Sequence, residues 1–173
     1  MVKLWLMSET FDDPRSECHR KPPEILSLDS LEQIGVLYYH YDTKNGLDSV
    51  AKERNYDYQD EVVINRGKLP NYDEKIKMFF EEHLHTDEEI RYVVDGSGYF
   101  DVRDKNDNWI RILVETGDLI ILPAGIYHRF TPDHSDYIHV IRMFRGNPKW
   151  EAHNRSQKTE NMEERLEYTK SMK

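Results

Sequence analysis

Hydrophobic and polar residues alternate along the second half of the chain, in short runs that glycine, asparagine and aspartate interrupt. A period of two is typical of β-strands with one buried face. We expect strands at 90–94, 99–103, 109–114, 119–122, 127–131 and 137–144, with turns at 96–98 and 104–108. Short strands at near-regular spacing predict a sandwich or a small barrel rather than a parallel α/β sheet.

The first half of the chain is more mixed. Ser27 is the expected N-cap of a short helix that ends at Gly35, and strand-forming residues follow it. The remaining expectations are an edge strand at 1–7, a loop through 12–14 and 22–23, the helix at 28–33, a strand at 36–41, helical sequence at 47–55, a brief strand at 61–64 and a helix at 73–79.

The chain becomes polar after Pro148, and residues 151–173 predict one charged, solvent-facing helix with a frayed end. A length of 173 residues suits one domain. We therefore expect a single domain over 1–173, with an N-terminal α/β extension and a charged C-terminal tail.

Composition excludes several classes of partner. The formal net charge of −9 argues against nucleic acid and anionic membranes, which need clustered lysine and arginine.

Cys18 is the only cysteine, so the chain forms no internal disulfide, and no activating cation is evident beside it. The apolar run at 1–7 is too short for a signal sequence or a membrane span. We therefore expect the protein to be located in the reducing cytosol.

The richest chemistry lies between positions 83 and 91. Alternate side chains of a strand share a face, so His83 and His85 point the same way. Glu89 and Arg91 join them if the alternation continues through the short turn. Two imidazoles and a carboxylate, with no thiolate, suit Fe(II), Ni(II), Mn(II) or Zn(II). Since 33% of residues are charged, a solvated face is the alternative for the His-x-His pair alone.

A second glycine-punctuated strand and turn, at 117–128, ends in His128. This histidine offers a fourth ligand from a distant strand. Ligand positions left open are what distinguish a catalytic metal site from a closed structural one. With this second block present, a metal site explains the pattern better than a solvated face does.

Both regions match known motifs. His83-x-His85-x3-Glu89-x6-Gly96 fits the first cupin motif, and Gly117-x5-Pro123-x-Gly125-x2-His128 fits the second. Pro132 replaces the asparagine that ends the general second motif, which is not a ligand position. Longer blocks resemble the acireductone dioxygenase family, namely 81–85, 88–92, 96–104, 109–111 and 122–130, within a resemblance that runs from 27 to 155.

The resemblance implies a mainly β fold, a cupin (jelly-roll) β-barrel with a few peripheral helices. It also implies one Fe(2+) or Ni(2+) per chain, bound by His83, His85, Glu89 and His128, with two of six octahedral positions open. The implied reaction is the cleavage by O2 of acireductone, 1,2-dihydroxy-5-(methylthio)pent-1-en-3-one, in methionine salvage. Formate and 4-methylthio-2-oxobutanoate, the 2-oxo acid precursor of methionine, would be the products of the Fe form. The Ni form would release 3-(methylthio)propanoate, formate and carbon monoxide.

Two phenylalanines are candidate walls of the substrate pocket. Strand parity places Phe130 beside His128, and it places Phe79 on the side of His83 if the strand begins that early. Ordinary core packing is an equally good account of each ring taken alone, and it is compatible with both being pocket walls.

Arg91 needs an anionic partner, because arginine is rarely buried unpaired. The partner is either Glu89 or a bound enediolate, and the enediolate is favoured because a ligating carboxylate already gives its charge to the metal. The resemblance also puts Arg91 in the substrate pocket. It further suggests that Glu82 and Arg142 pair to orient a ligand histidine, although strict alternation points Glu82 away from His83.

Two other classes of function remain open. One is a different cupin enzyme, such as a zinc-dependent isomerase, and the other is a non-enzymatic cupin that stores or senses a ligand. Arg91 and the long matching blocks favour the dioxygenase.

Animal members of the family are also described as binding the cytoplasmic tail of a membrane-anchored metalloproteinase. We expect a monomer in the cytoplasm, with the nucleus as a second location.

Overall fold

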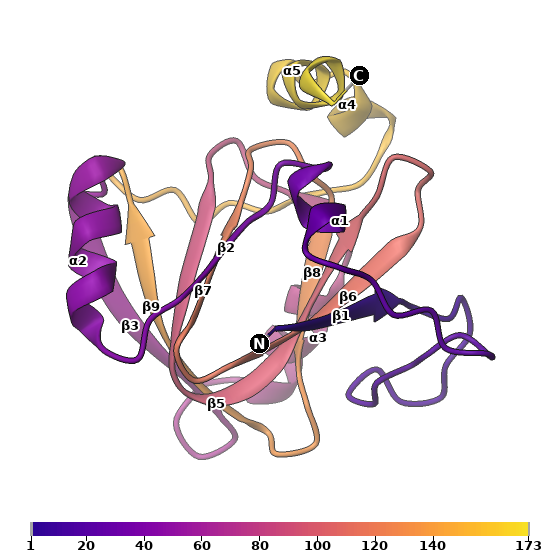
Figure 1. Ribbon diagram of the computed structural model, residues 1–173, viewed down its shortest axis with the longest axis horizontal. Helices are drawn as coiled ribbons and strands as arrows, with labels where there is room; N and C mark the ends of the chain where they lie inside the picture. Colours follow the sequence, from indigo (N-terminus) through magenta and orange to yellow (C-terminus); the bar gives the residue numbers. More distant parts are fainter. Residues whose placement is uncertain (1, 173) are drawn as a thin grey trace.

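Ten strands form one strongly curved antiparallel sheet that encloses the core, as the computed structural model shows for residues 2–172, the part of the chain it describes (Figure 1). The strands are β1 (Lys3–Leu6), β2 (Leu37–His40), β3 (Tyr58–Asn65), β4 (His83–Leu84), β5 (Glu89–Arg103), β6 (Trp109–Glu115), β7 (Asp118–Leu122), β8 (His128–Pro132), β9 (Tyr137–Phe144) and β10 (His153–Asn154). The helices are α1 (Asp29–Glu32), α2 (Lys44–Glu53), α3 (Tyr72–Phe80), α4 (Gln157–Glu160) and α5 (Glu163–Ser171). The expected mainly β barrel is confirmed.

Strand β5 belongs to both walls of the barrel. One wall runs β1-β6-β5-β8-β4-β10, and the other brings β2, β7, β5, β9 and β3 together. The first half of β5 pairs with β7 and β9, whereas its second half pairs with β6 and β8. A single strand thus joins the two walls.

The turn expected at 96–98 is wrong, because β5 continues through it as a bulged strand. The register with β9 shifts between Val93 and Asp95, and Gly96 has a φ of +85°. A Cβ atom on Gly96 would collide with the backbone oxygen of Tyr137. Glycine here permits a bulge and a close approach of two backbones, and in the sequence this resembles a turn.

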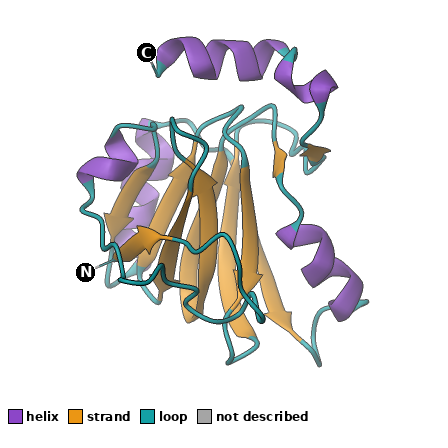
Figure 2. Ribbon diagram, turned by 90° about the vertical axis from the view of Figure 1, so that its right-hand side faces the viewer, coloured by secondary structure: helices purple, strands orange, loops and turns teal. Residues whose placement is uncertain are grey.

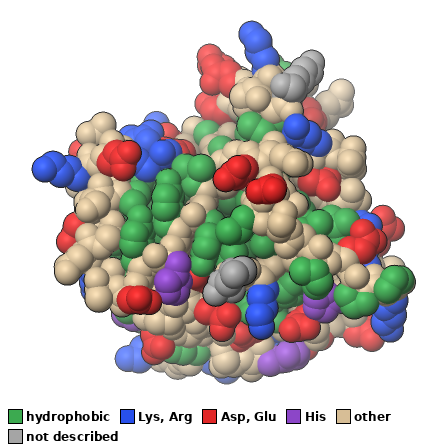
Figure 3. All heavy atoms as spheres, in the orientation of Figure 1, with side chains coloured by type: hydrophobic (Ala, Val, Ile, Leu, Met, Phe, Trp, Pro, Cys, Tyr) green, Lys and Arg blue, Asp and Glu red, His purple; other side chains and the backbone are tan. Residues whose placement is uncertain are grey.

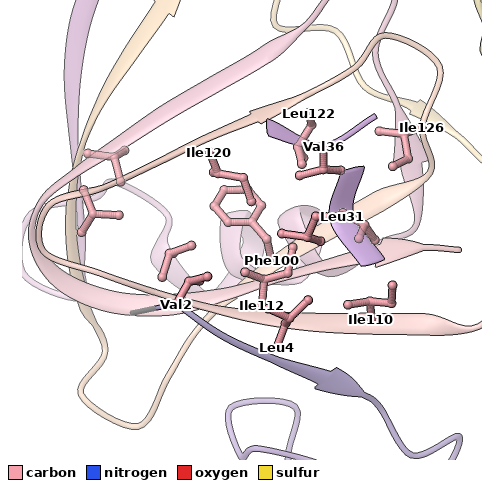
Figure 4. Packing of buried hydrophobic residues seen from close by; sticks show 14 of the residues in the cluster. Val2, Leu4, Leu31, Val36, Phe100, Ile110, Ile112, Ile120, Leu122 and Ile126 are labelled. Carbon is pink, nitrogen blue, oxygen red and sulfur yellow. The ribbon is translucent and has the colours of Figure 1, made fainter. Parts of the chain in front are cut away.

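Two apolar clusters lie on opposite faces of the sheet. Ile120 and Leu122 of β7 point into the barrel, whereas Leu119 and Ile121 pack under α2 on the outside. Burial on both faces explains the uninterrupted apolar run of this strand. Figure 4 shows the inner cluster, which includes Val2, Leu4, Leu31, Val36, Phe100, Ile110, Ile112, Ile120, Leu122 and Ile126.

The alternation on β5 sets the direction of the polar side chains near its start. Ile90 and Tyr92 belong to the outer cluster, whereas Val93, the next residue in the alternating pattern, belongs to the inner one. Glu89 and Arg91, which alternate with Ile90 and Tyr92, therefore face the barrel interior. This orientation brings two charged groups into the apolar lumen.

The N-terminal loop is attached to the barrel by a buried arginine. Arg111 is fully buried, and its Nε and Nη2 atoms donate to the carboxylate of Asp101 at 2.8 and 2.9 Å. Its Nη1 atom also donates to the backbone oxygens of Pro14 and Ser16. Because a buried guanidinium needs all these partners, the loop is fixed without regular secondary structure.

Helix α1 begins one residue later than expected. Leu28 rather than Ser27 is the N-cap residue, and it provides no side-chain hydrogen bond. The stop at Gly35 is confirmed, with a φ of +77°. The expected Ser27 cap is therefore wrong: the backbone oxygen of Ser27, instead of its hydroxyl, accepts the amide hydrogen of Ser30.

The C-terminal region differs most from expectation. Instead of one solvent-facing helix it forms β10, α4 and α5, and the two helices lie across one end of the barrel (Figure 2). Thr159 is buried, and the Tyr168 hydroxyl donates to the backbone oxygen of Ile34 at 2.8 Å. The charged composition of α5 hides these contacts, since few of its residues are apolar.

Acidic and basic side chains are interspersed over the face shown in Figure 3. No helix among residues 2–172 is long and apolar enough to cross a membrane.

Candidate metal centre

Three histidines converge at one end of the barrel interior. His83 begins β4, His85 follows its last residue, and His128 begins β8 directly opposite His83. One ring nitrogen from each histidine lies within 4.8 Å of those of the other two. Leu84, between the first two, is fully buried on the other side, as strand alternation requires.

Glu89 completes the cluster from the start of β5. Its Oε2 atom lies 3.0 Å from Nε2 of His128, and its Oε1 atom lies 3.7 Å from Nε2 of His85. Burial alone would raise the pKa of Glu89, but the guanidinium of Arg91 outweighs it and holds this pKa well below its usual value. The carboxylate is therefore charged at neutral pH.

Each imidazole is oriented by a backbone carbonyl. The Nδ1 atoms of His83, His85 and His128 donate to the backbone oxygens of Glu81, Glu151 and Ile126 at 2.6, 2.8 and 3.0 Å. A carbonyl only accepts, so in each neutral ring the proton is on Nδ1 and the lone pair is on Nε2. This is the arrangement that orients histidine ligands in metal sites.

The protonation of the rings suits metal binding as well. Burial, with the neighbouring imidazole of His128, lowers the pKa of His83 to about 3. Burial also lowers the pKa of His85. Protons therefore compete weakly with a cation for these two nitrogens near neutral pH.

Nε2 of His128 tests whether the residues fit a metal. It is buried, and among the described residues it has no hydrogen-bond partner, although Oε2 of Glu89 is 3.0 Å away. A nitrogen lone pair and a carboxylate oxygen repel each other unless a cation or a proton lies between them. The set of three nitrogens and one carboxylate fits an ion such as Fe(II) or Ni(II).

Arg91 lies between the cluster and an apolar cavity. Its Nη2 atom donates to Oε1 of Glu89 at 2.8 Å, and its Nη1 atom donates to the backbone oxygen of Ile90. The adjoining cavity has a volume of about 90 Å³ and also reaches Phe79 and Phe130, whose ring centroids are 6.4 Å apart. The full lining consists of Val62, Ile64, Phe79, Glu89, Arg91, Phe100, Phe130, Val140 and Arg142.

The expected pair of Glu82 and Arg142 is wrong. Glu82 instead accepts from Arg103 at 2.8 and 3.0 Å and from Arg155 at 2.8 Å. Arg142 donates to both carboxylate oxygens of Asp60, at 2.8 and 2.6 Å. Strand alternation turns Glu82 out of the lumen, whereas Arg142 lies on the cavity wall.

Arg142, which the sequence placed beside Glu82, has other neighbours in the site. It is the direct cross-strand partner of Arg91, and Asp60 is its own partner on the next strand. Arg91, Arg142 and Asp60 thus form a row across three strands, in which the Asp60 carboxylate balances the charge of Arg142. The ring of Trp150 lies over both arginines, 4.0 Å from Cζ of Arg142 and 5.6 Å from that of Arg91. Strand register could have indicated the row, but the position of Trp150 depends on a loop.

A larger groove of about 870 Å³ runs along the N-terminal loop and includes Cys18. Burial raises the pKa of the Cys18 thiol, so the thiol is not activated. The smaller cavity beside Glu89 is the better candidate site, because a carboxylate and two guanidinium groups meet an apolar wall there.

Comparison with known proteins identifies the family. Residues 3–152 match the model of the ARD/ARD' family. Acireductone dioxygenase of Macaca mulatta is 50% identical over 98% of this chain and 97% of its own. Acireductone dioxygenase of Branchiostoma floridae is 51% identical over 99% and 98%, respectively.

A solved structure shows the same fold. Acireductone dioxygenase from Bacillus anthracis, with a cadmium ion in its active centre, superposes with a TM-score of 0.70 at 23% identity. The match covers 88% of this chain and 97% of that one. It confirms the expected cupin barrel. With the family model matching most of the sequence, the chain belongs to the ARD/ARD' family.

Proposed function

We propose that the protein is a metal-dependent acireductone dioxygenase. The observation that carries the proposal is the convergence of three Nε2 lone pairs and the Glu89 carboxylate beside a cavity with an arginine in its wall. Relatives about half identical over nearly the full chain bear the same enzyme name. The reaction is the cleavage of acireductone by O2, a step of methionine salvage.

His83, His85, Glu89 and His128 would hold one Fe(2+) or Ni(2+) per chain. Their nitrogen and oxygen donors are acceptable to both ions, and four protein ligands leave two octahedral positions open. When bound, the ion supplies Lewis acidity and a template for the two oxygens of the substrate enediolate.

Arg91 would hold the anionic form of the substrate. In this structure its guanidinium is hydrogen-bonded to Glu89, the partner that the sequence left open as an alternative. Support for the substrate role comes from its position on the cavity wall, facing Arg142. A guanidinium in a poorly solvated site stabilises negative charge more strongly than one in water does.

The apolar walls would take the methylthio end of the substrate. Phe79 and Phe130 present aromatic rings to the cavity, and thioether sulfur makes favourable contacts with such rings. The same walls exclude water from the reacting carbons, which limits side reactions of an oxygenated product.

Oxygen uptake with acireductone tests the proposal. Protein freed of metal and reloaded with Fe(II) should consume O2 and give formate with 4-methylthio-2-oxobutanoate. The Ni(II) form should give formate, 3-(methylthio)propanoate and carbon monoxide, which headspace gas analysis detects. No O2 uptake with either ion would favour a ligand-storing cupin or a zinc isomerase. Identical products from both forms would mean that the pocket sets the site of oxygen attack.

We also propose that the chain is a monomer of the cytoplasm and nucleus. The single cysteine supports a reducing compartment. Light scattering tests the monomer, and imaging of the tagged protein tests the location. The cytoplasmic tail of a metalloproteinase is a candidate partner by family resemblance, and a pull-down with that peptide tests it.

A further inference from the structure

The three candidate histidine ligands are not oriented in the same way. His83 and His128 each donate to the carbonyl two residues earlier on their own segment, at Glu81 and Ile126. His85 instead donates to the carbonyl of Glu151, which is 66 residues away along the chain. Only this histidine depends on the C-terminal region for its hydrogen-bond acceptor.

The segment 151–155 runs along the edge of β4. Strand β10 pairs with β4, so that His153 lies opposite Leu84 and Asn154 lies opposite His83. Without β10, the edge of β4 that faces away from β8 would be unpaired. Within residues 2–172, the only other neighbour of β4 is β8, through the single pair of His83 and His128.

Side chains strengthen this pairing beyond the two-residue strand. Arg155 donates from its backbone to the oxygen of Glu82 at 3.0 Å and from Nη1 to the Glu82 carboxylate at 2.8 Å. The same Nη1 atom donates to Asp107. Asn154 donates to the carboxylate of Glu81 at 2.9 Å. Every residue from 81 to 85 thus meets the segment 151–155.

The helices that follow hold the segment in place. The Tyr127 hydroxyl, one residue before His128, bonds to Thr159 at 2.7 Å and to Glu160 at 2.8 Å. Arg165 donates to the backbone oxygen of Gly125 at 3.0 Å. The C-terminal region therefore contacts the chain before the third histidine as well as the segment that carries the first two.

We infer that the C-terminal segment 151–155 is a positioning element of the metal centre, in which the Glu151 carbonyl fixes the tautomer and ring orientation of His85. The inference rests on the proposed metal site and extends it to a region that contributes no ligand. Helices α4 and α5 keep this carbonyl in place. Loss of a partner that orients a ligand ring commonly lowers metal affinity tenfold to a hundredfold.

Replacement of Ala152 by lactic acid tests the carbonyl directly. It turns the Glu151–Ala152 peptide into an ester, whose carbonyl is a weaker hydrogen-bond acceptor. In metal-free protein, NMR of isotope-labelled ring nitrogens should show His85 partly shifted to the other tautomer. His83 and His128 should keep theirs, since their own carbonyls are unchanged. Ni(II) affinity, measured by competition with a chelating dye, should fall roughly tenfold to a hundredfold.

Arg155→Gln tests the segment by an independent route, because it removes the ion pairs with Glu82 and Asp107. The same two readouts should change in the same direction. Arg66→Gln is the matched control: its ion pair with Asp73 is largely exposed and lies outside this segment. It should leave the His85 tautomer and Ni(II) affinity at wild-type values.

Two results would overturn the inference. One is an unchanged His85 tautomer in the ester variant, and the other is an equal shift in all three histidines, which would indicate general loosening. Failure of the proposed function looks different, because wild-type protein would then bind no Ni(II) at this site. The tautomer comparison uses metal-free protein and decides the inference in either case.

Discussion

His83 and His128 are direct cross-strand partners: their Cα positions pair between β4 and β8, and their ring centroids lie 4.5 Å apart. Side chains of such a pair share a face at a separation that the spacing of adjacent strands sets. Two candidate ligands therefore owe their spacing to the sheet itself, and loops have little influence on it.

We expect His85→Ala and His128→Ala to lose metal and activity together. Each removes one of four donors, so both variants should retain little ion after dialysis. A saturating ion at about 100 times its Kd stabilises a protein by about 2.7 kcal/mol. Wild-type protein should gain this stability and the variants should not. His134→Ala, an exposed loop substitution, is the control. Stoichiometric metal in either ligand variant would contradict the assignment.

We expect Arg91→Leu to keep its metal and fold while activity falls. Loss of a charge-assisted contact costs about 1.5–3 kcal/mol, or roughly tenfold to a hundredfold in rate. In the metal-loaded protein, the positive charge of the ion balances the Glu89 carboxylate in place of the missing guanidinium. Metal content, melting temperature and turnover are the measurements. Arg145→Leu, a half-exposed partner of Glu88, is the control. If Arg91→Leu unfolds or releases metal, the arginine is a structural partner of Glu89.

Gly96→Ala should destabilise the protein more than Gly146→Ala. Both glycines have positive φ, so alanine at either position costs about 1–2 kcal/mol in backbone strain. A Cβ at Gly146 meets nothing within 4 Å, whereas one at Gly96 meets the backbone of Tyr137. We expect about 1–3 kcal/mol of additional loss from overpacking. Urea denaturation measures both, and equal losses would argue against the close approach of β5 and β9.

His40 should titrate above its ordinary value of about 6.5. Hydrogen bonds to Asp118 and Asp42 raise its pKa, and Asp118 has the larger effect. Since the folded pKa is raised, the stabilisation is fully present below the unfolded pKa of about 6.5 and is lost as pH rises through the folded pKa. The stability difference between wild-type protein and His40→Gln should therefore be largest below about pH 6.5 and should shrink as the pH rises above it.

NMR titration of the His40 ring gives the pKa itself. Asp118→Asn should lower it more than Asp42→Asn does, because Asp42 is almost fully exposed and its charge is screened by water. Equal shifts in the two variants would mean that burial of the partner has no influence.

Much of the barrel is evident from local patterns. Strand alternation indicates that His83 and His85 share a face, and it predicts that Glu89 and Arg91 join them if the alternation continues through the short turn. These features depend only on neighbouring residues. The apolar run of β7 likewise predicts a strand, although not that α2 covers its outer face.

The remaining features depend on distant contacts. Gly96 resembles a turn residue because its close approach to Tyr137 is invisible in the sequence. Glu82 faces Arg155, whose position follows from the path of the C-terminal chain. The acceptor of His85 is a backbone carbonyl, which every residue possesses, so no residue type could identify Glu151.

The bulge in β5 also constrains how the length of this strand can vary. Before the bulge, odd-numbered residues such as Glu89 and Arg91 face the interior, whereas after it the even-numbered Phe100 and Val102 do. Deletion of one residue anywhere between Arg91 and Phe100 would turn one half of the strand inside out relative to the other. The Glu89 carboxylate would then leave the lumen, or Phe100 and Val102 would. Related chains should therefore vary in the turn at 104–108 but keep the number of residues from 89 to 102.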